Sequence, residues 1–313
     1  MNNNSEEQRK KHLKEMLNMP LSYKFQKAIA TIDRFIIERG GVDKVYISFS
    51  GGKDSCVLLH IARLLYPEIK AMYVNTGLEY PEINDFIKTV DNIDIVRPAL
   101  SFKQVVEKYG FPAISKEISQ QVNEFHNLTK GCKTQLKRET QLINTKWSPF
   151  LSTSAPKISD RCCHKLKKNP AKKYEKETGR SPITGVMLTE SRLRRQQYLR
   201  QGCVAFSSGR HQAKPLSLWT EENVWEYIKL NNLEISKIYN EPEIDRTGCV
   251  FCLFGAHMDK AKRLVALKRL HPKLFEYSFY KLGMGEALSY MYEQCNIKFE
   301  DEIIKEIKKL KKY

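Results

Sequence analysis

A six-residue stretch, Ser50-Gly51-Gly52-Lys53-Asp54-Ser55, constrains the fold and the chemistry of this chain more than any other feature. It follows an apolar, β-branched run at residues 45–49 and precedes an apolar-periodic segment at residues 56–61. This order predicts a strand, a tight glycine turn and the start of a helix. Glycines let a backbone come close to a ligand, and the N–H groups at a helix N-terminus attract anions. Lys53 adds positive charge and Ser50 and Ser55 add hydroxyls, so the stretch predicts a phosphate site.

The spacing of this stretch differs from the G-x-x-x-x-G-K-[ST] pattern of the common NTPase P-loop. It resembles instead the PP-loop of the N-type ATP pyrophosphatases, which split ATP between its α and β phosphates. The resemblance implies that residues 50–55 bind ATP, with Mg²⁺ near the phosphates, and that Lys53 and Asp54 are catalytic. Asp54 or Glu79 would help to hold the Mg²⁺. We expect Lys53 to lie in a solvent-facing loop. The competing interpretation of the stretch is an ordinary strand–turn–helix corner.

Strand and helix patterns alternate through the first third of the chain. Strands are expected at residues 45–50, 69–75 and 93–96, helices at 54–65, 81–90 and 101–109, and a late strand at 183–188. Such alternation predicts an α/β fold with a doubly wound parallel sheet. In these sheets ligands bind beyond the carboxyl ends of the strands, so residues 50–55 and the triplet Asn75-Thr76-Gly77 are expected to face one pocket.

The pattern outside this region predicts helical extensions at both ends. We expect an N-terminal helical segment at residues 1–40, a main domain at 41–257 with a basic insertion at 111–160, and a C-terminal helical segment at 258–313. Gly40 and Gly41 end the first segment. Within the main domain, a helix at 161–178 is expected to be interrupted at Pro170. A helix at 221–230 follows Thr220 without a full capping box.

The charge of the chain is strongly positive and unevenly placed. The formal net charge is +17, and residues 130–214 hold 20 Lys and Arg against 5 Asp and Glu, a local excess of +15. Such a block suits a polyanion, either nucleic acid or several phosphates, although a solvated surface is the alternative. No apolar run has the length of a membrane helix and the N-terminus has no apolar signal core, so we expect a cytoplasmic protein without a membrane partner.

Eight cysteines in a cytoplasmic protein point to metal binding or catalysis rather than disulfides. The adjacent pair Cys162-Cys163 and the later Cys249-x-x-Cys252 supply four thiolates in two close pairs. This is the ligand count of an iron–sulfur cluster or of a structural zinc. Adjacent cysteines cannot easily turn both sulfurs onto one small ion, which favours [4Fe–4S] over zinc and either metal over four unrelated core thiols.

The chain resembles the phosphoadenosine-phosphosulfate (PAPS) reductase family of the PP-loop superfamily, whose fold is adenine nucleotide alpha hydrolase-like, over roughly residues 40–257. Besides residues 50–55 and the four cysteines, the resemblance rests on residues 75–82, Lys165, Pro170, Gly185, residues 190–192, 215–221 and 246–249. The cysteine pattern is that of cluster-bearing adenylyl-sulfate reductases and of ATP pyrophosphatases used in sulfur incorporation, including DNA phosphorothioation.

The resemblance also implies roles for individual residues. Cys162, Cys163, Cys249 and Cys252 would be the ligands of a [4Fe–4S] cluster. Asn75, Thr76 and Gly77 would line the adenine and ribose pocket. Arg192, with Arg194 and Arg195, would meet the phosphates or the acceptor.

Two departures from the family pattern bear on the reaction. Sulfonucleotide reductases carry a nucleophilic cysteine in a Glu-Cys-Gly-x-His tail, whereas Cys295 lies in Glu293-Gln294-Cys295-Asn296. The cluster-bearing reductases often have a degenerate PP-loop, whereas residues 50–55 keep the full pattern. Both departures favour adenylation of an acceptor over sulfonucleotide reduction.

The hypothesis is therefore an ATP pyrophosphatase-type enzyme that adenylates an acceptor for sulfur incorporation. Nucleic acid is the expected acceptor and a protein such as a cysteine desulfurase the sulfur donor. The alternatives are a thiol-dependent PAPS or adenylyl-sulfate reductase and a non-catalytic nucleotide-binding regulatory protein. The identity of the acceptor and donor, the role of the cluster in carrying sulfur, and homo-oligomerisation stay open.

Cys132, flanked by lysines, ranks first in reactivity among the non-cluster thiols. The roles of Cys203 and Cys295 are open. Trp219 and Trp225 are expected in the core rather than as base-stacking platforms.

Overall fold

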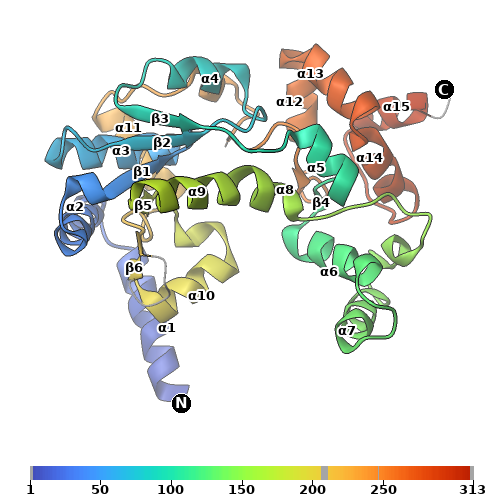
Figure 1. The fold of residues 1–313 in the computed structure, drawn as a ribbon, viewed down its shortest axis with the longest axis horizontal. Coiled ribbons are helices and arrows are strands. Elements are labelled where there is room, and N and C mark those ends of the chain that lie inside the picture. Colours follow the sequence, from blue (N-terminus) through green and yellow to red (C-terminus); the bar gives the residue numbers. More distant parts are fainter. Residues whose placement is uncertain (1–2, 206–210, 246, 311–313) are drawn as a thin grey trace. The chain divides into compact units, whose positions relative to one another are not determined.

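The computed structural model describes residues 3–205, 211–245 and 247–310, and the chain divides into two compact units (Figure 1). Unit 1 comprises Met1–Val74, Pro81–Val96 and Ala171–Ile238, and unit 2 comprises Asn75–Tyr80, Arg97–Pro170 and Tyr239–Tyr313. Both units are assembled from separate stretches of the chain. The division into segments 1–40, 41–257 and 258–313 stays a prediction.

Unit 1 contains the main sheet. Its strands are β1 (Val45–Phe49), β2 (Ala71–Val74), β3 (Ile93–Val96), β5 (Ser181–Thr184), β6 (Val204–Ala205) and β7 (Gln212–Ala213). Its helices are α1 (Asn3–Leu17), α2 (Leu21–Arg39), α3 (Lys53–Leu65), α4 (Pro81–Ile87), α9 (Asn169–Thr178, from Ala171 onward), α10 (Arg192–Gln201) and α11 (Glu221–Leu230).

In the described residues the strand order of this sheet is β3-β2-β1-β5-β7-β6, and only β6 pairs antiparallel. The register of the central strands pairs Ile47 with Ala71 on one side and with Ile183 on the other. The chain runs outward from β1 to β3 and then returns to the other side of β1 at β5. This reversal is the switch point at which doubly wound sheets bind ligands, and residues 50–55 leave β1 there. The α/β fold predicted from the sequence is confirmed.

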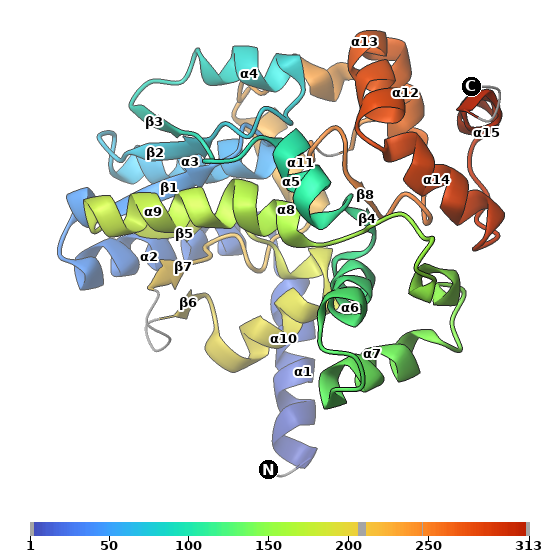
Figure 2. The ribbon, with the colours of Figure 1, turned by 45° about the vertical axis from the view of Figure 1, so that its right-hand side comes forward.

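Helices cover both faces of this sheet. Tyr174 of α9 packs against Tyr46 and Met72, which alternate with buried residues of the opposite face. Helix α3 packs on β1 from that opposite face, with α2 and α11 against α3 (Figures 1 and 2). The apolar side chains of α3, among them Leu58 and Ile61, are almost fully buried.

Unit 2 is mostly helical. Its helices are α5 (Phe102–Tyr109), α6 (Lys116–Asn127), α7 (Lys133–Leu142), α8 (Arg161–Cys163), α12 (Lys262–Leu270), α13 (Pro272–Glu276), α14 (Met284–Glu293) and α15 (Asp301–Leu310). Its two short strands, β4 (Ala113–Ile114) and β8 (Leu253–Phe254), pair in parallel. The C-terminal helix predicted to reach residue 313 is described as far as Leu310.

Three local expectations were wrong. The capping box of α11 is complete, because the Asn223 side chain accepts the Thr220 N–H and the Thr220 hydroxyl accepts the Asn223 N–H. The helix around Pro170 is interrupted earlier, by a π-helical turn at His164–Lys168, and continues through Pro170. The late strand β5 ends at Thr184, and a 3-10 turn at Leu188–Glu190 replaces its expected end.

Among the residues that the structure describes, no helix combines the length and the apolar character needed to span a membrane.

Candidate functional site

The loop from β1 to α3 depends on glycine at position 51. Gly51 has a φ of +72°, a conformation that L side chains rarely adopt. A Cβ atom there would lie 2.8 Å from Cγ2 of Ile83 and 3.2 Å from Cδ1 of Ile87, both on α4. Gly52 then takes the N-cap position of α3 in an extended conformation and without a side-chain cap. The turn therefore brings bare backbone to the start of the helix, as the sequence predicts.

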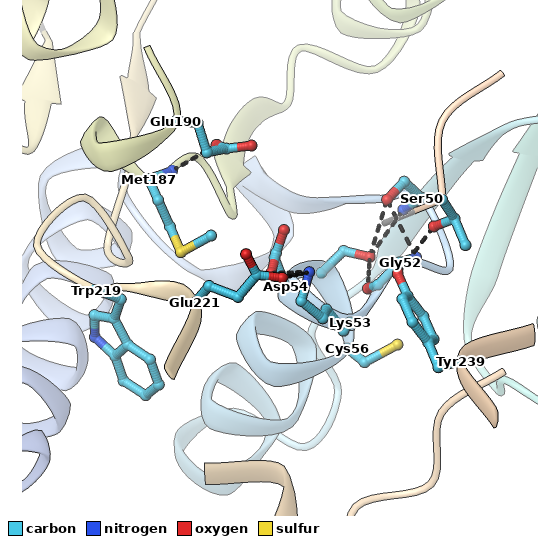
Figure 3. Close-up of polar contacts among 12 residues, drawn as sticks. Ser50, Gly52, Lys53, Asp54, Cys56, Met187, Glu190, Trp219, Glu221 and Tyr239 are labelled. Atoms are coloured by element: carbon cyan, nitrogen blue, oxygen red, sulfur yellow. Dashed lines mark hydrogen bonds and ion pairs between the residues drawn. The ribbon is translucent and has the colours of Figure 1, made fainter. Parts of the chain in front are cut away.

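Two serines hold this loop in shape. The Ser50 N–H donates to Oγ of Ser55 at 3.2 Å, and the Gly52 N–H donates to Oγ of Ser50 at 3.3 Å. The Ser55 hydroxyl donates to the Gly52 carbonyl at 2.8 Å (Figure 3). The hydroxyls of Ser50 and Ser55 thus link the end of β1 to the first turn of α3, which fixes the loop before any ligand binds.

Lys53 does not lie in a solvent-facing loop. It is the first residue of α3, only 3% exposed, and its Nζ atom lies 3.1 Å from Oε1 of Glu221 and 3.8 Å from Oδ1 of Asp54 (Figure 3). Glu221 begins α11, which packs on α3. The Lys53 ammonium also lies 5.8 Å from the ring centre of Trp225. The ammonium group of Lys53 is therefore paired with two carboxylates that belong to unit 1, as the loop does.

Glu221 is a site residue that sequence reasoning missed. It ends the segment 215–221 that supports the family resemblance, but nothing in that segment shows which distant cation its carboxylate meets. Trp219 is fully buried, as expected, and donates its indole N–H to the Lys24 carbonyl. Trp225 is 36% exposed, so its assignment to the core was wrong, and its ring lies beside Lys53 instead.

The loop after β5 comes close to the first turn of α3. A Cβ atom at Gly185 would lie 3.1 Å from the Asp54 carbonyl oxygen, so glycine is needed for this approach. Behind the loop, Cys56 is buried and its thiol lies 3.8 Å from the Gly51 carbonyl. Burial raises the pKa of Cys56, as does the charge of Asp54, which suits a packing role.

The triplet at residues 75–77 directly follows β2 and forms its own turn in unit 2. The Gly77 N–H donates to Oδ1 of Asn75 at 3.1 Å, and Gly77 has a φ of +72°. The Thr76 hydroxyl donates to Oε1 of Glu79 at 2.6 Å, and the Leu78 N–H donates to Oε2 of Glu79 at 3.1 Å. Both carboxylate oxygens of Glu79 are thus engaged in the turn.

Arg192 begins α10, whose N-cap Ser191 accepts the N–H of Arg194. The Arg192 and Arg195 side chains are exposed, whereas Arg194 forms an ion pair with Glu190. This helix has no buried residue. It therefore presents a basic surface on unit 1.

One short segment, residues 111–114, is hydrogen-bonded to both parts of the chain that carry the cysteine pairs. The sequence did not reveal this connection. On one side of residues 111–114, the Phe111 N–H donates to the Lys157 carbonyl and the Phe111 carbonyl accepts the Ser159 N–H. On the other side, the Leu253 N–H donates to the Pro112 carbonyl. Cys162 and Cys163 follow the first flank and Cys249 and Cys252 precede the second. All four lie in unit 2.

The four thiols influence one another's protonation. Cys162 is 6% exposed, and its hydrogen bond to Cys163 raises the pKa of Cys162 and lowers that of Cys163. Burial raises the pKa of Cys249, and it raises the pKa of Cys252 to about 12. The charge of the Cys249 thiolate in turn raises the pKa of Lys167. Lys167, which follows the pair through the π-helical turn, is a second residue that sequence reasoning missed.

The donor set fits an iron–sulfur cluster by its chemistry. Four thiols lie on two segments flanking one strand, and the positive charges of Lys116, Lys167 and Lys168 favour the thiolate of Cys163. Arg263 braces the second segment by donating to the carbonyls of Cys252 and Phe254. Among the described side chains, no group of three or more His, Cys, Asp or Glu is placed to hold a single metal ion.

The remaining cysteines have packing or capping roles. Cys132 is the N-cap of α7 and its sulfur accepts the Gln135 N–H at 3.4 Å. Burial raises the pKa of Cys203, and it raises the pKa of Cys295 to about 11. Cys295 is only 4% exposed. The burial of Cys203 and Cys295 does not suit a nucleophile, and the expected reactivity of Cys132 stays a prediction.

The sequence matches a known family over most of this architecture. Residues 44–141 and 102–253 match the phosphoadenosine phosphosulfate reductase domain, and together these matches cover more than half of the chain. The chain therefore belongs to this family. Membership of this family identifies the chain as an enzyme.

Curated relatives are distant. An uncharacterized protein of Methanocaldococcus jannaschii is 25% identical over 233 residues, which are 73% of this chain and 45% of that protein. The chain thus spans about half the length of that relative. The adenosine 5'-phosphosulfate reductase of Staphylococcus haemolyticus is 24% identical over 228 residues, which are 71% of this chain and 76% of that enzyme.

Solved structures show only a loose likeness. The PAPS reductase of Candida auris in complex with phosphate covers 75% of this chain and 90% of its own, with 14% identity and a TM-score of 0.41. The U34-tRNA thiolase of Methanococcus maripaludis with its [4Fe–4S] cluster covers 94% of this chain and 90% of its own, with 14% identity and a TM-score of 0.36. At these TM-scores the likeness bears on neither the ligands nor the activity of this chain.

Proposed function

We propose that this chain is an ATP pyrophosphatase-type enzyme that adenylates an acceptor for sulfur incorporation. The observation that carries the proposal is the complete loop at residues 50–55. Its glycine turn, its serine hydrogen bonds and its lysine all meet at the N-terminus of α3. A helix N-terminus with a lysine beside it suits the phosphates of ATP.

In this reaction an acceptor oxygen attacks the α phosphorus of ATP. The bond between the α phosphorus and the bridging oxygen breaks, so that pyrophosphate leaves with the electron pair and the acceptor carries AMP. Lys53 and the N–H groups of the loop stabilise the charge that develops on pyrophosphate. Mg²⁺ would enter with the nucleotide, held by its phosphates and by Asp54. A sulfur donor then displaces AMP.

The proposed cluster ligands are Cys162, Cys163, Cys249 and Cys252, supported by their donor chemistry and by the lysines around them. A [4Fe–4S] cluster held by these four thiolates, one on each iron, would supply electron transfer. The residues of this chain would hold the cluster against β4 and β8 and balance its negative charge through Lys167.

The proposed acceptor is a nucleic acid, and DNA phosphorothioation is the most specific form of this proposal. The excess of +15 over residues 130–214 and the exposed arginines of α10 support a polyanionic partner. A cysteine desulfurase is the proposed sulfur donor.

The second candidate is reduction of PAPS or adenylyl sulfate with a thiol partner, which the family and the relatives named above favour. Against it stands Cys295, the one cysteine after Cys252 in the printed sequence, because it is buried and its pKa is raised to about 11. A reductase nucleophile needs an accessible thiolate.

One experiment separates the two reactions. The anaerobically purified chain is incubated with α-labelled ATP, with and without duplex DNA or tRNA, and in parallel with PAPS or adenylyl sulfate and thioredoxin. We expect pyrophosphate and a labelled adenylyl group on the nucleic acid from the first incubation, and no sulfite from the second. Sulfite without pyrophosphate would assign the reductase function.

The ion pair between Lys53 and Glu221 gives a further prediction. Phosphates that reach Lys53 must compete with the Glu221 carboxylate, which is 3.1 Å away and half exposed. Glu221→Gln removes the competing charge, so we expect ATP to bind about five-fold more tightly, the range of a partly exposed ion pair. Isothermal titration calorimetry measures the affinity. Glu222→Gln, one residue further along α11, is the matched control, and equal affinities for the two variants would contradict the competition.

Nucleic-acid binding should depend steeply on salt. Arg195, Arg200 and Lys172 are exposed in unit 1, whereas Lys167 and Lys168 lie near the cysteines and are left intact. Changing the three exposed residues to Gln should reduce the slope of log affinity against log salt by about 0.9 for each phosphate that the variant no longer neutralises. Fluorescence anisotropy on duplex DNA and tRNA measures this slope.

The matched control changes three exposed lysines outside the block, Lys44, Lys88 and Lys229, to Gln. It alters the net charge equally and should leave the slope nearly unchanged. A similar decrease of the slope in both variants would show that general charge, rather than the block at 130–214, binds nucleic acid.

A further inference from the structure

The loop that carries Cys249 and Cys252 is anchored through its backbone. The Cys252 N–H donates to the Cys249 carbonyl at 3.1 Å, which closes the turn of the C-x-x-C motif. The Val250 N–H donates to the Leu78 carbonyl at 2.8 Å. These bonds fix the first half of the loop, whereas the carbonyl of Cys252 takes its donor from a side chain elsewhere in unit 2.

That donor is one guanidinium, which lies against both ends of the loop. Nη2 of Arg263 donates to the Cys252 carbonyl at 3.2 Å and to the Phe254 carbonyl at 3.1 Å. A Cβ atom at Gly248 would lie 3.7 Å from Nη1 of the same arginine. Arg263 therefore touches the loop just before Cys249 and again at Cys252, so its position bears on both thiols of the pair.

The turn that leads to Arg263 is strained. Lys260 and Ala261, just before α12, have φ values of +54° and +64°, a left-handed conformation that L side chains rarely adopt. Asp259 holds this turn, because its Oδ1 accepts the Ala261 N–H at 2.9 Å and its Oδ2 lies 3.6 Å from Nε of Arg263. Backbone strain of this kind persists only where the surrounding structure maintains it, and it is concentrated at functional sites.

We propose that Arg263 is a positioning residue for the thiols of Cys249 and Cys252, and that Asp259 sets its guanidinium in place. Outer partners of this kind orient metal ligands, and a positive charge beside them favours electron uptake by an iron–sulfur cluster. The inference rests on the cluster of the proposed function. It adds a residue that lies beyond the part of the chain that matches the family, residues 44–253.

The test compares variants of the full chain that are purified anaerobically. Loss of iron to a chelator is followed by visible absorption, and the reduction potential is measured by redox titration. Arg263→Gln should lose iron about ten-fold faster than wild type, the lower end of the effect of removing an outer partner of a metal ligand. Its reduction potential should be more negative, because a positive charge is removed.

Two further variants separate position from charge. Arg263→Lys keeps the charge but lacks the planar fork of donors, so it should lose iron faster at a potential near that of wild type. Asp259→Asn can still accept the Ala261 N–H but no longer pairs with Arg263. It should therefore lose iron about two- to five-fold faster even if Arg263→Gln does not fold.

Arg269→Gln is the matched control. It removes another arginine of α12, whose exposed side chain pairs with Glu241 and Glu243 at 2.8 Å each, and it should match wild type in both measurements. Effects as large in Arg269→Gln as in Arg263→Gln would overturn the proposal, because loss of charge on α12 would then explain them.

The wild-type chain separates failure of this inference from failure of the proposed function. A wild-type chain without iron and sulfide would refute the cluster and the role of Arg263 together. A wild-type chain that holds the cluster, with the same rate of iron loss and the same potential in both Arg263 variants, would refute the role of Arg263 alone.

Discussion

Replacing Lys53 with Met should reduce pyrophosphate release from ATP by about a hundred- to a thousand-fold, the loss seen when one preorganised donor to a developing charge is removed. Lys53 is the one side-chain cation of the six-residue loop, and its Nζ atom lies at the first turn of α3. Methionine keeps the apolar stem beside Trp225. Pyrophosphate is measured by a coupled phosphate assay under anaerobic conditions.

The fold should survive this substitution. Glu221 loses its partner, but its side chain is half exposed and can be hydrated, so we expect a loss of about 1 kcal/mol or less in the free energy of unfolding. The double variant Lys53→Met with Glu221→Gln removes both charges and is the control for stability. Wild-type rates of pyrophosphate release from a folded Lys53→Met variant would refute the PP-loop interpretation.

Local patterns in the sequence predicted most of the main sheet. The strand at 93–96, the helix start after Ser101 and the helix end at Gly40 lie where expected, because a capping serine and a left-handed glycine are local signals. The two-residue strands β4 and β8 were missed. A pair of residues has no periodicity, and only pairing with distant backbone defines such strands.

The candidate site likewise has one part that the local sequence predicts and another part that depends on distant packing. Gly51 and the two serines of the loop act within a few residues of one another, so their arrangement follows from the motif. The burial of Lys53 depends on α11, which the chain reaches only after it has built β5 and α10. The sequence predicts that a lysine is present in the loop, but the packing of α11 on α3 decides that a carboxylate meets it.

The cysteine pairs combine a local motif with a contact between distant segments. The assignment of the four cysteines as ligands stays a prediction, and the structure joins their two segments through residues 111–114. No residue in that segment is a recognisable ligand, so its role as the common partner was invisible in the sequence. The same packing sets Lys167 beside Cys249.

Loss of one cysteine of the set should abolish the metal centre altogether. Anaerobically purified protein should be brown, with about four iron and about four acid-labile sulfide per chain. Cys162→Ser or Cys249→Ser should lose the colour and most of the iron, because a cubane cluster held by three thiolates and a weak hydroxyl ligand is lost readily. Iron and sulfide analysis, together with the visible absorption spectrum, measures this.

Cys132→Ser is the matched control for the cluster variants, because it also changes a cysteine of unit 2. Cys132 caps α7, and serine is a better N-cap than cysteine, so the variant should keep its fold and its full content of iron and sulfide. Equal metal loss in Cys132→Ser and Cys162→Ser would show that general thiol loss, rather than loss of a ligand, causes the effect. Stoichiometric zinc without sulfide in the wild-type protein would refute the cluster. It would instead indicate that the four sulfurs bind a single zinc ion, at about 2.3 Å from one point.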